Sequence, residues 1–181
     1  LIERECFGAR IHLRAHVTEI RRDHPIAILV RRKKFDHYLA DRAEEAGAIL
    51  RQGDPVQKVT VLPDRVEVGT ELGQYETRAL VGADGANSVV GRTIRPMFPR
   101  DEMAAALVGA VPADDREIID RLDGMLDLFF GVAARGYGWI FPHKGYFQVG
   151  VLGEASEFDE PQKVFSEFAA ARGMPVPRPQ G

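Results

Sequence analysis

The sequence predicts a mixed α/β (α+β) fold, in which an α/β unit carries an inserted β-meander and is followed by an antiparallel sheet. Three observations support this prediction. Apolar residues recur at helical spacing across residues 34–47, which predicts a helix. Short strand-like runs separated by turn residues crowd into residues 48–78. Further strand-like runs within residues 125–152 are joined by short connections, as is typical of antiparallel sheets.

The composition is that of a folded domain and excludes several classes of protein. The chain has 181 residues, of which 45% are hydrophobic, enough for one medium domain or for parts of two. Its formal net charge of -3 argues against a nucleic-acid partner. The single cysteine, Cys6, excludes a disulfide framework, and we expect a small buried thiol there. No apolar run approaches the roughly 18 residues that span a bilayer.

The first half of the chain predicts strands around one clearly marked helix. Partial alternation of apolar and polar residues over 9–20 predicts a half-buried strand, and a turn at 22–25 leads to a second strand at 26–30. In the helix, Phe35, Leu39, Ala43 and Ala46 share one face, and Gly47 ends it. Further strands are expected at residues 48–50, 56–62, 65–68 and 74–78.

The wholly apolar run at residues 79–81 predicts a strand buried on both faces of a parallel sheet, followed by a helix over 88–94. The second half predicts strands at 104–111, 125–132, 138–142 and 146–152, with helices at 114–122 and 161–172. Pro161 suits the first turn of the last helix. Prolines begin to punctuate the chain near residue 97, and we expect a domain boundary there.

The strongest local signal for chemistry is the glycine-rich turn Gly82-Ala83-Asp84-Gly85-Ala86-Asn87-Ser88, between the buried strand and the helix. In open α/β sheets, ligands bind at the carboxyl ends of strands, where glycines let the backbone approach closely. Asp84 is a poor phosphate ligand because two anions repel, but it suits accepting hydrogen bonds from amides or ligand hydroxyls. The alternative is an Asp-Gly turn in which Ser88 only caps the helix.

This turn resembles the internal Asp-Gly motif of flavoproteins built like p-hydroxybenzoate hydroxylase and the geranylgeranyl reductases. The resemblance implies that Gly82, Asp84, Gly85 and Ser88 lie near FAD. The aromatic hydroxylases usually carry an arginine three residues after the serine, whereas this chain has Gly91 there and Arg92 one position later. This departure favours a reductase, and Arg92 is either a cofactor contact or a surface cation.

Two other segments resemble the same families. Arg32-Lys33-Lys34-Phe35-Asp36-His37-Tyr38-Leu39 resembles the Arg-x-x-Phe-Asp-x-x-Leu that opens a helix, which makes Arg32 a candidate FAD contact and Arg31 a weaker one. The alternative is a solvated run of basic residues. Tyr137-Gly138-Trp139-Ile140-Phe141-Pro142 resembles the Tyr-x-Trp-x-Phe-Pro motif of the geranylgeranyl reductases.

Strand periodicity places the three aromatic side chains of this motif on one face. Such a wall could lie along a polyprenyl chain, so Tyr137, Trp139, Phe141 and Pro142 are candidate substrate-binding residues. The alternative is a layer of core side chains, which we favour for Phe141. Gly136 and Gly138 leave the opposite face open to close approach.

The resemblance implies an FAD-dependent oxidoreductase that reduces carbon-carbon double bonds of a small isoprenoid or lipid, with NADPH or ferredoxin as electron donor. Residues 1–96 would be part of an FAD-binding Rossmann-like domain, with strands of 1–30 crossing over to the other domain. Residues 97–181 would be part of an antiparallel-sheet substrate domain. Two alternatives stay open, an FAD-dependent aromatic monooxygenase and a fragment that is inactive by itself.

The resemblance also sets limits. The N-terminal Gly-x-Gly-x-x-Gly unit and the C-terminal Gly-Asp segment of the family are absent, so we expect a fragment. Cys6 lacks the context of the family's cysteine loop. No catalytic residue is assigned, the histidines predict no metal site, and His143 is expected to be an exposed turn residue rather than a proton donor. We expect a cytoplasmic protein, with peripheral membrane contact and the oligomeric state left open.

Overall fold

The computed structural model describes residues 1–176 and residue 178, and it divides the chain into two compact units. The first unit combines residues 1–38 with residues 100–181, and the second consists of residues 39–99. The chain passes between the units within helix α1 (Arg32–Glu45) and again after Pro99. The assignment of the two units to a cofactor domain and a substrate domain stays a prediction.

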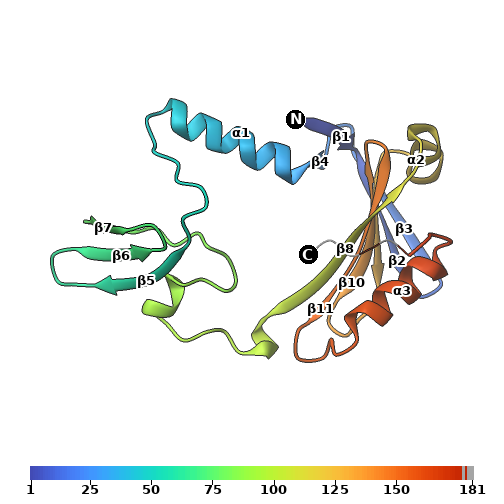
Figure 1. Cartoon of the computed structure of the whole chain (residues 1–181). Coiled ribbons are helices and arrows are strands. Elements are labelled where there is room, and N and C mark those ends of the chain that lie inside the picture. Colours follow the sequence, from blue (N-terminus) through green and yellow to red (C-terminus); the bar gives the residue numbers. More distant parts are fainter. Residues whose placement is uncertain (177, 179–181) are drawn as a thin grey trace. The chain divides into compact units, whose positions relative to one another are not determined.

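A six-stranded sheet dominates the first unit (Figure 1). Its strand order is β3-β2-β9-β10-β11-β8, and all neighbours pair antiparallel except β2 and β9, which run parallel. Its strands are β2 (Gly8–Leu13), β3 (His16–Arg21), β8 (Ala104–Pro112), β9 (Met125–Phe130), β10 (Tyr137–His143) and β11 (Tyr146–Glu154). Two strands of the N-terminal region, β1 (Ile2–Cys6) and β4 (Ala27–Val30), pair separately. The predicted strands of the second half are therefore confirmed.

Two helices pack their apolar side chains against one face of this sheet. Helix α2 (Asp115–Leu122) begins after Asp114, whose carboxylate accepts a hydrogen bond from the Glu117 amide at 2.8 Å. Helix α3 (Pro161–Ala171) has proline in its first turn, as predicted. The cluster contains Ile118 and Leu122 of α2, Phe165 and Phe168 of α3, and Val111, Phe129, Ile140, Phe147, Val149 and Val151 of the sheet.

The expected strand over residues 9–20 is wrong in one respect. It is a hairpin, because β2 and β3 fold back on each other with Leu13 opposite His16. Arg14 adopts φ 53° in the connecting turn, a conformation that lies outside the strand region. The partial alternation in the sequence therefore belonged to two strands that share a sheet.

The second unit holds the predicted β-meander, with strands β5 (Val56–Val61), β6 (Val66–Thr70) and β7 (Gln74–Thr77). Helix α1 starts two residues before the predicted first residue, and Gly47 follows its end with φ +96°, the left-handed conformation expected after a helix. None of the side chains of α1 is buried, and Leu39 is half exposed.

Three predictions in this unit are wrong. Residues 48–50 form no strand, and neither do residues 79–81, where Val81 is 87% exposed. A strand requires a hydrogen-bonded neighbour, and the described residues provide none for either segment. The helix expected over residues 88–94 is only a 3₁₀ turn, Gly91–Thr93. A second 3₁₀ turn, Arg100–Glu102, opens the return to the first unit.

Candidate functional site

The Asp-Gly turn folds around the carboxylate of Asp84. One oxygen accepts a hydrogen bond from the Ser88 hydroxyl, and the other accepts from the amides of Val89 at 2.6 Å and Val90 at 3.2 Å. The Ser88 hydroxyl oxygen accepts in turn from the Gly91 amide at 2.6 Å. The carboxylate thus organises the backbone of the turn, while Ser88 accepts from the amide three residues later, as the alternative of an Asp-Gly turn capped by Ser88 expects.

These hydrogen bonds lower the pKa of Asp84, with the Ser88 hydroxyl as the largest cause. The carboxylate therefore stays ionised at neutral pH. The guanidinium of Arg92 donates to the carbonyl oxygens of Ser88 and Asn87, both at 3.1 Å, and its role as a cofactor contact stays a prediction. Arg92 closes the turn from outside.

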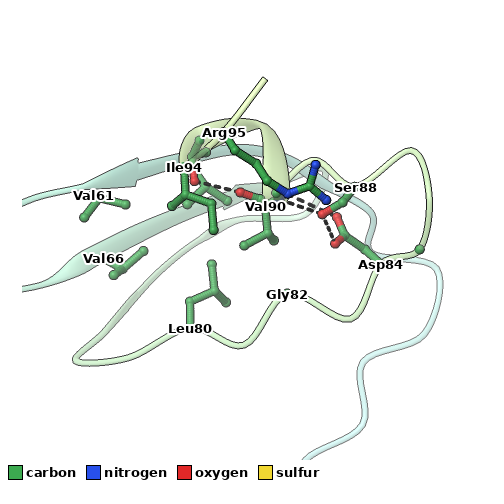
Figure 2. Close-up of a pocket in the computed structure, with 13 residues that line it drawn as sticks. Val61, Val66, Leu80, Gly82, Asp84, Ser88, Val90, Ile94 and Arg95 are labelled. Carbon is green, nitrogen blue, oxygen red and sulfur yellow. Dashed lines mark hydrogen bonds between the residues drawn. The ribbon is translucent and has the colours of Figure 1, made fainter. Parts of the chain in front are cut away.

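A cavity of about 380 Å³ opens between this turn and the meander (Figure 2). Gly82 has no room for a side chain, because an added Cβ would lie 2.9 Å from Val90. The lining combines an apolar floor with a polar edge that contains Asp84 and Ser88. The apolar residues are Val59, Val61, Val66, Leu80, Val90 and Ile94. The structure thus brings Gly82, Asp84, Gly85 and Ser88 together around one cavity.

Arg32 lies in a different cavity, of about 550 Å³, within the first unit. Its guanidinium pairs with Asp36 one helical turn later, with Nε to Oδ1 at 3.0 Å. Arg31 pairs with Glu3 at 3.0 Å and lies over the ring of Tyr146. The lining residues are Val30, Arg31, Arg32, Lys33, Val108, Gly109, Ala110, Pro112, Gly145, Tyr146 and Gln148.

This second cavity suits an anion. The first turn of α1 contains no acidic residue, and the free amides of a helix N-terminus attract negative charge. Of the three consecutive basic residues at the same place, Arg31 is paired with Glu3 and Arg32 with Asp36. The apolar Val108 and Ala110 form another part of the wall, so the cavity combines a cationic side with an apolar side.

The aromatic side chains of β10 form a row on one face of the six-stranded sheet, as their spacing predicted. The ring centroids of Tyr137 and Trp139 are 5.8 Å apart, and those of Trp139 and Phe141 are 6.1 Å apart. Phe130 of β9 extends the row, with its centroid 5.8 Å from that of Tyr137. We call these four residues the aromatic row. Sequence spacing could not place Phe130 in it, because β9 and β10 meet only in the folded sheet.

Within the row, burial differs from the expectation. Trp139 is 8% exposed, whereas Tyr137 and Phe141 are only partly buried. The indole lies over Gly150 of β11, where an added Cβ would be 2.1 Å from the ring. Its Nε1 donates to Gln148 at 3.3 Å. Trp139 is therefore the core residue of the three, and the preference for Phe141 as the core residue is wrong.

The opposite face of β10 packs against helix α3. An added Cβ at Gly138 would lie 2.7 Å from the ring of Phe168, so this glycine admits an aromatic side chain. Pro142 is fully buried and, by strand alternation, lies on the face opposite the aromatic row. It is separated from the other three candidate substrate-binding residues.

His143 corrects another expectation, since it is buried rather than exposed in a turn. Its Nδ1 lies 2.7 Å from Oε2 of Glu3, and its ring stacks on Tyr146 with centroids 4.8 Å apart. Arg31 lies on the other oxygen of Glu3. We call Glu3, Arg31, His143 and Tyr146 the Glu3 cluster. No sequence pattern could have found it, because Glu3 and His143 are 140 positions apart.

The sequence also singled out the thiol of Cys6. Cys6 is buried, as expected, and this burial raises the pKa of its thiol to about 11. The thiol therefore stays protonated at neutral pH, which argues against a nucleophilic role.

Among residues 1–176 and 178, no group of three or more His, Cys, Asp or Glu is arranged to hold a metal ion. In the same part of the chain, no helix has the length and apolar character needed to cross a membrane.

Comparison with known proteins points to one group of sequence relatives. The chain is 31% identical over 135 residues to a geranylgeranyl diphosphate reductase of Rhodobacter capsulatus, covering 68% of this chain and 32% of the relative. It is 30% identical over 155 residues to a digeranylgeranylglycerophospholipid reductase of Methanosarcina acetivorans, covering 77% and 36%. No protein-family model matches the chain. The chain spans about a third of the length of these relatives.

Solved structures share the fold. A geranylgeranyl bacteriochlorophyll reductase-like protein from Thermoplasma acidophilum superposes with a TM-score of 0.77 at 20% identity, over 99% of this chain and 49% of that one. The halogenase PltM, solved with phloroglucinol and FAD, superposes with a TM-score of 0.70 at 12% identity, over 93% and 40%. At these identities the similarity concerns the fold alone, and it confirms the mixed α/β class.

Proposed function

We propose, from the homology of this chain to the geranylgeranyl reductases, that it forms part of an FAD-dependent oxidoreductase that reduces carbon-carbon double bonds of an isoprenoid lipid. The aromatic row is the observation that carries the proposal. Its neighbouring ring centroids are 5.8 to 6.1 Å apart, and Phe130, Tyr137 and Phe141 are partly exposed on either side of the buried Trp139. An extended prenyl chain could lie along such a surface and be shielded from water.

The residues present fit a flavin dinucleotide. The cavity at the Asp-Gly turn combines apolar side chains with the carboxylate of Asp84 and the hydroxyl of Ser88, groups that suit the apolar ring and the hydroxyl groups of a flavin cofactor. We propose that Gly82, Gly85 and Ser88 face the cofactor. Arg32 is proposed separately as a cofactor contact, from its place in the Arg-x-x-Phe-Asp-x-x-Leu motif. When bound, the flavin would supply the hydride chemistry.

The roles of the chain's own residues follow from this arrangement. Tyr137 and Phe141, which are partly exposed, would contact the prenyl chain, while the buried Trp139 would hold the row in place. Asp84 would act through the turn that it organises rather than by direct contact. We assign no proton donor. NADPH or ferredoxin would supply electrons, and a lipid substrate would bring the protein to a membrane surface.

An assay of the complete protein tests the proposal. Geranylgeranyl diphosphate incubated with the protein and reduced FAD should gain two hydrogen atoms for each reduced double bond, measured by mass spectrometry. The same protein should leave an aromatic ring unhydroxylated in the presence of oxygen. Ring hydroxylation without alkene reduction would support the monooxygenase alternative and overturn the proposal.

Replacing Asp84 by alanine should weaken FAD retention by the complete protein by about tenfold or more. The variant loses the acceptor of three hydrogen bonds, so the backbone amides of the turn no longer hold their positions. The flavin dissociation constant, measured by fluorescence titration, checks this result. Asp64→Ala is the matched control, because Asp64 is an exposed turn aspartate in the same unit, outside the cavity. Equal dissociation constants for the two variants would reduce Asp84 to an ordinary turn residue.

A further inference from the structure

A separate cavity, of about 450 Å³, lies at the end of the six-stranded sheet where β2 and β9 stop. These two strands run parallel with Leu13 opposite Phe130, so both end at the same place. Its lining comes wholly from the first unit and shares no residue with the cavities at Asp84 and Arg32. The lining residues are His12, Leu13, Arg14, Phe129, Phe130, Gly131, Val132 and Arg172.

The charged side chains that line this cavity are all basic. It contains two arginines and a histidine, and none of the eight lining residues is acidic. The carboxylate nearest to the histidine is Asp127, whose Oδ2 lies 3.5 Å from His12 Nε2. Arg10 offsets it, with Nε 3.3 Å from Oδ1, and burial raises the pKa of Asp127 despite that cation. The cavity is therefore cationic.

One nitrogen atom in the lining lacks a hydrogen-bond partner. Arg172 Nε is buried and forms no hydrogen bond with any described residue, whereas His12 Nε2 faces Asp127 at 3.5 Å. Buried polar atoms in native proteins are paired in the great majority of cases, because an unpaired one loses its hydration without compensation. An acceptor oxygen of a ligand in the cavity would supply the missing partner of Arg172.

The aromatic packing keeps these side chains in position. The ring of His12 stacks on Phe129 with centroids 4.1 Å apart and planes 14° apart. The guanidinium of Arg172 lies over the same ring, with Cζ 4.5 Å from its centroid, and also contacts Phe168. Both side chains thus pack on one buried phenylalanine, which limits the conformational entropy lost when a ligand binds.

We propose that this cavity binds a phosphate group. Two arginines match the double negative charge of phosphate better than the single charge of a carboxylate. The planar guanidinium groups can each donate two parallel hydrogen bonds to phosphate oxygens. Apart from Phe130, the lining shares no residue with the aromatic row or with the cavities at Asp84 and Arg32, so the phosphate site goes beyond the function proposed above.

Titration of the complete protein with inorganic phosphate, followed by ³¹P nuclear magnetic resonance at constant ionic strength, tests the proposal. Arg14→Asn and Arg172→Gln should each raise the dissociation constant about tenfold, the loss expected for one charge-assisted interaction. Asparagine tolerates the left-handed backbone of Arg14. Arg116→Gln is the matched control, since this side chain is 91% exposed and lies outside the cavity.

Two results would overturn the phosphate site. One is equal phosphate affinity in Arg14→Asn and Arg116→Gln. The other is acetate binding as tightly as phosphate, which would mean that the cavity recognises any single negative charge. Arg172 also packs on Phe129 and Phe168, so the melting temperature of its variant is measured alongside. If Arg172→Gln does not fold, the comparison of Arg14→Asn with Arg116→Gln decides.

Discussion

Replacing Trp139 by alanine should lower the free energy of unfolding by about 3–5 kcal/mol, the cost of deleting a buried aromatic side chain. Trp139 is 8% exposed, and its indole covers Gly150 on the neighbouring strand. Urea unfolding of the variant and of the parent chain measures the difference. Phe130→Ala is the matched control within the aromatic row, and because Phe130 is 44% exposed we expect a distinctly smaller loss.

A substitution at Gly150, which the indole of Trp139 covers, tests this packing more directly. Gly150→Ala should destabilise the chain by about 1–3 kcal/mol, because its methyl group would lie 2.1 Å from the indole and force it to move. In the double variant the indole is gone, so the alanine at position 150 has space. The loss of stability in the double variant should therefore be smaller than the sum of the two single losses by about 1 kcal/mol or more.

Strictly additive losses would show that Trp139 and Gly150 do not pack together as described. If Trp139→Ala lowers the free energy of unfolding by less than about 1 kcal/mol, Trp139 lines a pocket rather than the core. In that case, a stable and flavin-loaded Trp139→Ala protein that fails to reduce geranylgeranyl diphosphate would mark it as a direct substrate contact. Stability and turnover are therefore measured on the same preparation.

Replacing Glu3 by alanine should destabilise the chain by about 3 kcal/mol, since it removes one partner of a buried ion-paired network. The carboxylate of Glu3 joins His143 at 2.7 Å to Arg31 at 3.0 Å, and the Glu3 and His143 side chains are 12% and 5% exposed. Without it, the buried ring of His143 would lose its hydrogen-bond partner and Arg31 would lose its ion pair. The midpoint of urea unfolding reports the loss.

Glu5→Ala is the control for this experiment. It removes a carboxylate from the same strand, β1, at an exposed position, so its effect should stay within about 0.5 kcal/mol. If the two variants unfold at the same urea concentration, the Glu3 cluster contributes nothing to stability. If Glu3→Ala is the less stable, the N-terminal strand is held to the sheet by this network.

The sequence by itself determined the features that depend on neighbours along the chain. Asp114 and Pro161 marked the starts of two helices, because capping and the missing proline amide act within one helical turn. Tyr137, Trp139 and Phe141 were placed on one face because side chains alternate along any strand. The Asp-Gly turn closes through contacts within seven residues, and its resemblance to flavoproteins identified the fold.

Only the tertiary structure decided which distant segments meet. It placed β2 beside β9, joined Glu3 to His143, and put the indole of Trp139 on Gly150. It also showed that residues 79–81 form no strand, although their apolar composition suits one. The physical reason is common to all of these cases. A strand ladder, a buried ion pair and a packed ring each need a partner from elsewhere in the chain, and local sequence does not encode where that partner will lie.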